Sequence, residues 1–93
     1  MLTNVSEELP QLLIGLSLMS NQTVEELYKL IGRKIVTLRK AKSMSQEKLA
    51  DASELDRTHI GFIEQGRRRP TIETLYKLSE ALDCEVEDFF KTD

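Results

Sequence analysis

The sequence has few of the side chains from which metal centres, disulfides and catalytic sites are commonly built. Its 93 residues include one cysteine, one histidine and no tryptophan. The single Cys84 cannot form an internal disulfide or supply a cysteine-based zinc site, and it suits a reducing, cytoplasmic location. Because we find no Cys-His or Ser-His constellation, glycine-rich phosphate loop or metal-ligand cluster, the sequence predicts neither an enzyme nor a cofactor-binding protein.

Long hydrophobic runs are also missing. No run of 18 apolar residues occurs, so we expect no membrane-spanning helix. The most apolar stretch, 9–19, follows two glutamates where a signal peptide would carry Lys or Arg, which argues against export. Its spacing instead predicts a short amphipathic helix that needs a partner surface, with an apolar stripe of Leu9, Leu12, Leu13, Leu16 and Met19. Met19 could also be an internal start codon, in which case residues 1–18 would be absent from some products.

The net charge of −3 would by itself argue against a nucleic-acid partner, but the charges are unevenly distributed. Residues 33–70 carry ten basic and five acidic side chains, whereas both flanking segments, 1–32 and 71–93, are net acidic. This asymmetry favours one surface that faces a polyanion. The alternative interpretation is a set of solvated helix faces.

Hydrophobic spacing predicts five helices after an N-terminal extension over residues 1–22. We expect them over about 24–42, 45–53, 57–65, 72–82 and 86–91. Helix-start signals support three of them: Thr23 with Glu26 as a capping box, Ser45 as a cap, and Asp56 as a cap. Gly66 is positioned to end the third helix. The fold class is therefore all-α, with five core helices in residues 23–93 and an extra N-terminal helix.

The second and third predicted helices, joined by residues 53–56, form a helix-turn-helix candidate. Small Ala50 would let the two helices approach closely, and apolar residues around it would fill the space between them. Helical geometry then turns the other face of the third helix outward, namely Arg57, Thr58, Gly61, Phe62 and Gln65. This is the surface that would enter a major groove.

Three segments carry a resemblance to a known family: QEKLA (46–50), LDRTHI (55–60) and IEQG (63–66), followed by Pro70. Over about residues 28–91 the sequence resembles the phage-repressor (Cro and cI, XRE) type of helix-turn-helix proteins. Within that family it is most similar to the controller proteins of restriction-modification systems, which are homodimeric transcriptional regulators. The resemblance implies a regulator that binds double-stranded DNA at a palindromic operator.

The resemblance also implies roles for single residues. Arg57 and Thr58 match base-reading positions, and Arg can bond both O6 and N7 of guanine. Phe62 lies where a third reader would be, either touching a thymine methyl or packing against its own protein. Gln46 and His59 match positions that contact the DNA backbone, although His59 could be an inactive surface residue.

The loop that follows the third helix contains three further phosphate-contact candidates, Arg67, Arg68 and Arg69, of which we favour Arg68. The alternative is that this loop is only solvated. Arg39 and Glu64 match positions that form a buried or half-buried ion pair in related proteins. Two positions depart from the family pattern, because Glu54 and Asp83 stand where Gly or Asn is common. The turn at Glu54 should be either strained or altered.

A homodimer is expected because one short recognition helix reads only a few base pairs. The interface that we favour is the last helix, through Val86, Phe89 and Phe90, because a small core should not bury two adjacent aromatics. The N-terminal helix is the second candidate. That helix also leaves open another function, an antitoxin or other interaction module that binds a partner protein.

Overall fold

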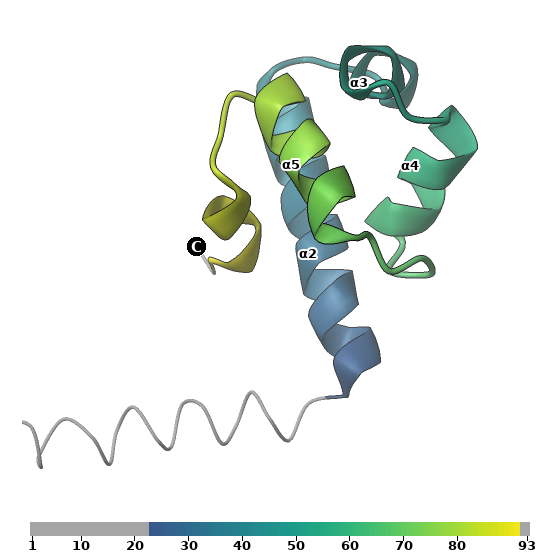
Figure 1. Cartoon of the computed structure of the whole chain (residues 1–93), viewed down its shortest axis with the longest axis vertical. Coiled ribbons are helices and arrows are strands. Elements are labelled where there is room, and N and C mark those ends of the chain that lie inside the picture. Colours follow the sequence, from purple (N-terminus) through teal and green to yellow (C-terminus); the bar gives the residue numbers. More distant parts are fainter. Residues whose placement is uncertain (1–22, 92–93) are drawn as a thin grey trace, which may run out of the picture.

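The computed structural model describes residues 23–91, which form four α-helices and a terminal 3₁₀ helix (Figure 1). The elements are α2 (Val24–Ala41), α3 (Gln46–Ser53), α4 (Arg57–Glu64), α5 (Ile72–Ala81) and η1 (Val86–Phe90). No strand occurs within these residues, so the all-helical prediction is confirmed for them. The last element differs, since it is a 3₁₀ helix and not an α-helix. The predicted helix over 9–19 lies outside the described residues.

Helix starts follow the capping residues at two of the three predicted positions. Thr23 Oγ1 accepts a hydrogen bond from the Glu26 N–H at 3.2 Å, and Ser45 Oγ accepts one from the Lys48 N–H at 3.0 Å. Asp56 does precede α4, but its exposed side chain makes no capping bond. The predicted side-chain cap at Asp56 is therefore wrong, and only its backbone carbonyl contributes, by accepting from the Ile60 N–H at 3.0 Å.

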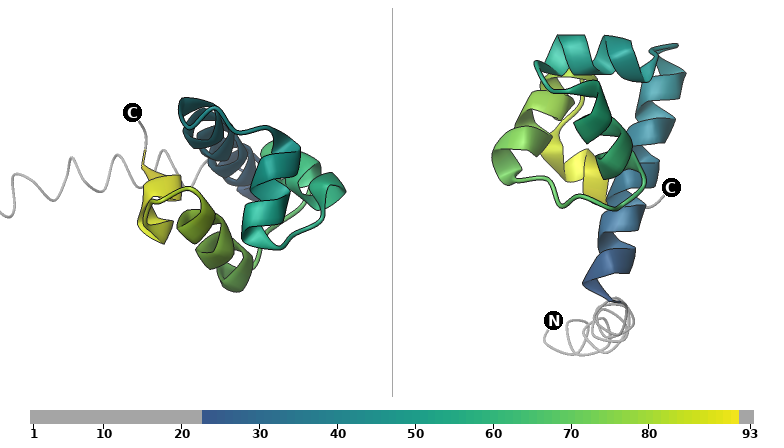
Figure 2. Two further views of the ribbon diagram at one scale, coloured as in Figure 1. Left: turned by 90° about the horizontal axis from the view of Figure 1, so that it is seen from above. Right: turned by 90° about the vertical axis from the view of Figure 1, so that its right-hand side faces the viewer.

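The core is enclosed by all five elements, and each of them packs against two others. Helix α3 contacts α4 and α5, while α2 contacts α4 on one side and η1 on the other (Figures 1 and 2). The buried apolar side chains come from every element: Ile31, Ile35, Leu49, Ala50, Ile60, Ile63, Leu75, Leu78, Leu82 and Phe89. In the described part of the chain, no helix is long and apolar enough to cross a membrane.

One residue of the predicted dimer interface belongs to this core. Phe89 is only 1% exposed, because η1 folds back against α2 and α5 and places this ring among the core side chains. The expectation that Phe89 faces a partner is therefore corrected. Phe90 remains 48% exposed and Val86 is half-buried, so these two residues are the part of the predicted interface that reaches the surface.

The helices are joined by left-handed turns, and two of them approach closely at a glycine. A Cβ atom on Gly32 of α2 would come within 2.4 Å of the Glu64 carbonyl oxygen, so α2 and α4 approach each other at a residue without a side chain. The turn between α3 and α4 passes through Glu54 at φ 58°, and the turn after α5 passes through Asp83 at φ 54°. Of the two alternatives for Glu54, the strained turn is the one observed. A left-handed conformation costs an L-residue about 1 kcal/mol.

Candidate nucleic-acid interface

Helices α3 and α4 lie together on one side of α2, and η1 lies on the other side (Figure 1). The short helix α4 has two different faces. Ile60, Ile63 and Glu64 are buried, whereas Arg57 and Thr58 are exposed at its N-terminal end. The structure therefore separates the side chains that hold α4 in place from those that are free to meet a ligand.

The outer face of α4 is slightly hollowed. We call this feature the recognition hollow, and its lining residues are Gln46, Arg57, Thr58, Gly61, Phe62 and Gln65. It unites the predicted base readers of α4 with Gln46, the first residue of α3. A guanidinium, a hydroxyl and two amides offer the donors and acceptors that base edges in a major groove require.

Phe62 separates the recognition hollow from a second hollow, which it lines with Arg67 and Arg68. The guanidinium carbons of these two arginines lie 5.1 and 5.8 Å from the centre of the Phe62 ring, within cation–π range. Phe62 is half-buried. Phe62 thus packs against its own protein, through Arg67 and Arg68, and also lines the outer surface, where contact with a thymine remains a prediction.

The three consecutive arginines have different surroundings. Arg67 and Arg68 are exposed beside Phe62, whereas Arg69 donates from Nη2 to Glu25 Oε1 at 2.9 Å and lies 5.3 Å from the centre of the Tyr28 ring. Arg69 thus connects the loop to α2. Arg67 and Arg68 have no acidic partner among the ion pairs that the structure describes, so they are the freer candidates for phosphate.

A buried polar network holds the inner face of α4. Arg39 Nε donates to Glu64 Oε2 at 2.6 Å, and Arg39 Nη2 donates to Glu64 Oε1 at 3.1 Å. The remaining guanidinium nitrogen, Nη1, donates to the Met44 carbonyl at 2.8 Å. The side chains of Arg39 and Glu64 are 11% and 5% exposed. This two-pronged geometry joins the end of α2 to the end of α4.

Gln46 connects this network to the recognition hollow, which it also lines. Its Nε2 donates to Glu64 Oε1 at 2.8 Å, so part of an amide predicted to contact DNA is engaged inside the protein. The sequence assigned Gln46 and Glu64 to separate roles, and only the crossing of α3 over α4 reveals that they touch. Among the described residues, no buried side-chain nitrogen or oxygen lacks a hydrogen-bond partner.

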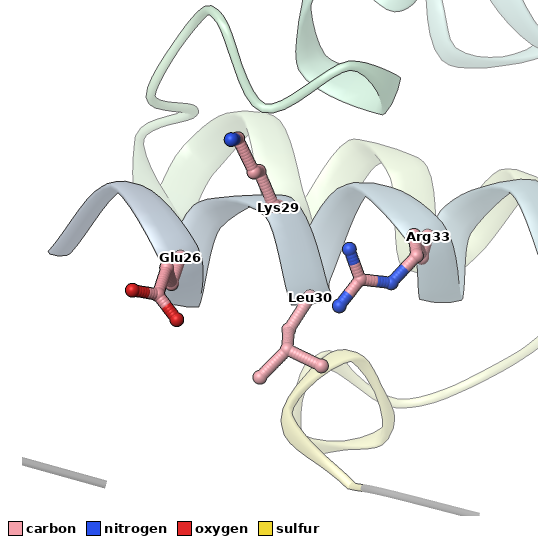
Figure 3. A pocket seen from close by; sticks show the side chains of 4 residues that line it. All are labelled: Glu26, Lys29, Leu30 and Arg33. Carbon is pink, nitrogen blue, oxygen red and sulfur yellow. The ribbon is translucent and has the colours of Figure 1, made fainter. Parts of the chain in front are cut away.

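Three other features of residues 23–91 bear on possible further sites. Burial raises the pKa of the Cys84 thiol, which disfavours the reactive thiolate. A hollow along α2 is lined by Glu26, Lys29, Leu30 and Arg33, but Figure 3 shows that the two basic side chains leave the helix in different directions. Residues 23–91 contain no group of His, Cys, Asp and Glu side chains that could hold a metal ion.

The fold and the site define a helix-turn-helix protein, and comparison with known proteins supports this class. The model of the HTH_3 family, described as helix-turn-helix, matches residues 35–89. The chain belongs to this family, and it is a helix-turn-helix transcriptional regulator.

More particular similarities point to controller proteins. The chain is 43% identical over 60 residues to control protein C.BamHI of Bacillus amyloliquefaciens, covering 63% of this chain and 74% of that protein. It is 34% identical over 61 residues to control protein C.SmaI of Serratia marcescens, covering 66% and 73%. The crystal structure of the restriction-modification controller protein C.AhdI of Aeromonas hydrophila superposes with a TM-score of 0.66 at 42% identity, covering 70% of this chain and 97% of that one. The resemblance stated from the sequence is confirmed.

Proposed function

We propose that this protein is a homodimeric transcriptional regulator that binds a palindromic operator and controls a restriction-modification system. The observation that carries the proposal is the outer face of α4, where Arg57 and Thr58 are exposed beside a hollow while the inner face of the same helix is locked. The similarity to controller proteins supports the restriction-modification setting. A regulator of this kind would act in the cytoplasm, in contact with the DNA that it controls.

The roles follow from the chemistry of the exposed groups. Arg57 would bond O6 and N7 of a guanine, and Thr58 would offer its hydroxyl or methyl group to the neighbouring base. Arg67, Arg68 and His59 would contact phosphates and set the register of α4 in the groove. The N-terminus of α3 at Gln46 would add backbone N–H groups that favour an anion.

Two copies are needed because α4 has only eight residues. A two-fold axis would place two recognition helices about 34 Å apart on one face of the duplex. The surface proposed for pairing contains Val86 and Phe90 on η1, which lies across α2 from the recognition surface (Figure 1).

The test is a binding selection from random duplexes, combined with light scattering of the protein–DNA complex. We expect a palindrome whose half-site centres are about one helical turn apart, bound by two chains. Absence of any enriched sequence would overturn the proposal, and an asymmetric site bound by one chain would overturn the homodimer.

The pairing surface is tested by Phe90→Asp. Because Phe90 is 48% exposed, the variant should fold, remain monomeric and lose cooperative binding to the palindrome. Tyr76→Asp is the matched control, since Tyr76 is 55% exposed on α5. If Phe90→Asp remained dimeric, the proposal that η1 forms the interface would be refuted.

A further inference from the structure

We propose that Gly61 makes the recognition hollow a receptor for the 5-methyl group of a thymine. This inference rests on the proposed function, because it names a base feature that the same surface would read. Gly61 lies inside α4, where glycine is less favourable than alanine because it loses more conformational freedom on folding. Its presence therefore calls for a physical reason.

Neither packing nor backbone conformation supplies that reason in the free protein. A Cβ atom added to Gly61 would meet only Gln46 Nε2, at 4.0 Å, which is ordinary contact distance. Gly66 is the only glycine with positive φ in the described residues. Gly32 provides the contrast, because a Cβ there would collide with two carbonyl oxygens of α4, at 2.4 and 2.5 Å. The space above Gly61 is thus empty in the protein and open to the outside.

The walls of the hollow suit a methyl group beside a polar base edge. Arg57 and Thr58 stand four and three residues before Gly61, so they flank it on the same stripe of the helix. Among the lining residues, Phe62 contributes apolar surface, Thr58 carries both a methyl and a hydroxyl group, and Arg57 and Gln65 carry polar groups. In the major groove, thymine presents its methyl group next to the O4 acceptor. Gly61 would let that methyl approach the backbone of α4.

The experiment compares operators in which single thymines are replaced symmetrically by uracil, which removes only the methyl group. For the wild-type protein, we expect one thymine per half-site whose replacement weakens binding about fourfold per half-site, the effect of burying one methyl group. The remaining replacements should have less effect.

The key variant is Gly61→Ala. It should raise Tm by a few degrees, since alanine fits without collision and favours the helix. Binding to the thymine operator should nevertheless weaken about tenfold or more, because the new methyl fills the space that the thymine methyl would occupy. The variant should also lose the preference for thymine over uracil at the sensitive position. Thr37→Ala, at an exposed position of α2 outside the hollow, is the control and should bind like the wild type.

The outcomes separate this inference from the function on which it rests. If the wild-type protein selects no sequence, the proposed function fails. If it selects an operator but no uracil replacement weakens binding, the methyl receptor is refuted and the proposed function stands. Equal weakening of Gly61→Ala on thymine and uracil operators, or unchanged binding, would also refute the receptor.

Discussion

The two faces of α4 differ in burial and in hydrogen bonding, although the helix has only eight residues. On its inner face, Glu64 makes three hydrogen bonds to Arg39 and Gln46, and its side chain is almost fully buried. On its outer face, Arg57 and Thr58 are exposed around an empty hollow. The inner face tolerates little change because its polar groups are matched, whereas the exposed side chains of the outer face can vary without disturbing these bonds.

This difference explains how so small a domain can hold the exposed face of α4 in a fixed position. Arg39 connects α4 to α2 and, through the Met44 carbonyl, to the segment that precedes α3. The orientation of α4 is therefore fixed by hydrogen bonds on its buried face. Variants of the inner face should lose stability first, and variants of the outer face should lose only binding.

The largest expected effect is loss of the buried ion pair. Glu64→Ala should lower the free energy of unfolding by about 3–5 kcal/mol, because the Arg39 guanidinium is left buried without its partner. Arg39→Ala should have a similar effect, which thermal and urea denaturation would measure. The matched control is Arg39→Met with Glu64→Leu, which removes both charges and should recover much of the loss. An unchanged Tm for Arg39→Ala would exclude the structural role.

Gly32→Ala should have the next largest effect on folding. The new methyl group would collide with the backbone of α4, and overpacking of this kind costs about 1–3 kcal/mol or more. Denaturation of Gly32→Ala beside Gly61→Ala compares the two faces directly. We expect opposite signs, with Gly32→Ala less stable and Gly61→Ala more stable than the wild type. Equal changes in stability for the two variants would contradict the difference in free space around the two glycines.

Arg57→Ala should reduce binding without reducing stability. We expect a loss of about 1–3 kcal/mol at the cognate operator and little change on random duplexes, because a guanine contact is made only at the right sequence. Titration at one fixed salt concentration, with a melting curve of each protein, would measure both quantities. Equal losses on cognate and random DNA would refute the base-reading role.

Arg68→Ala should have a smaller and less selective effect. Loss of one phosphate contact should weaken binding to every duplex and make the slope of log K against log salt shallower by about one unit. Arg69→Ala is the matched control, because Arg69 is paired with Glu25 and should change the slope less. If the slope for Arg68→Ala were unchanged, Arg68 would not be a phosphate contact.

The smallest effect is expected for an ion pair at the surface. Lys42 Nζ lies 2.6 Å from Asp83 Oδ2 and holds the pKa of that carboxyl below its ordinary value of 3.8. Because this pKa is lower in the folded protein than in the unfolded chain, the ion pair stabilises the fold at any pH above the unfolded-state pKa. The stabilisation is lost as the pH falls from that value through the lower, folded-state pKa. Lys42→Gln should therefore slightly flatten the acid limb of the stability profile. Asp88 also contributes to this acid limb, because a backbone hydrogen bond from Glu85 is the main cause of its lowered pKa. Lys42→Gln should leave the contribution of Asp88 unchanged. A profile identical to the wild type would show that the surface pair contributes nothing.

Local signals in the sequence predicted local structure well. Thr23 and Ser45 cap helices because a hydroxyl needs only the next turn as its partner, and this relation is visible in the spacing of residues. The resemblance to repressor proteins supplied the Arg39–Glu64 pair. It could not supply Gln46 as a partner of Glu64, because that contact depends on where α3 crosses α4. The burial of Phe89 was missed for a similar reason, since an aromatic pair in a sequence does not show which ring faces the core.

The most direct test of the division between the two faces is to repeat the binding selection with Arg57→Ala. If the outer face of α4 reads bases while the inner face holds the fold, the variant should select the same palindrome and spacing but lose the guanine preference at one position in each half-site. A consensus identical to that of the wild type would contradict base reading by α4.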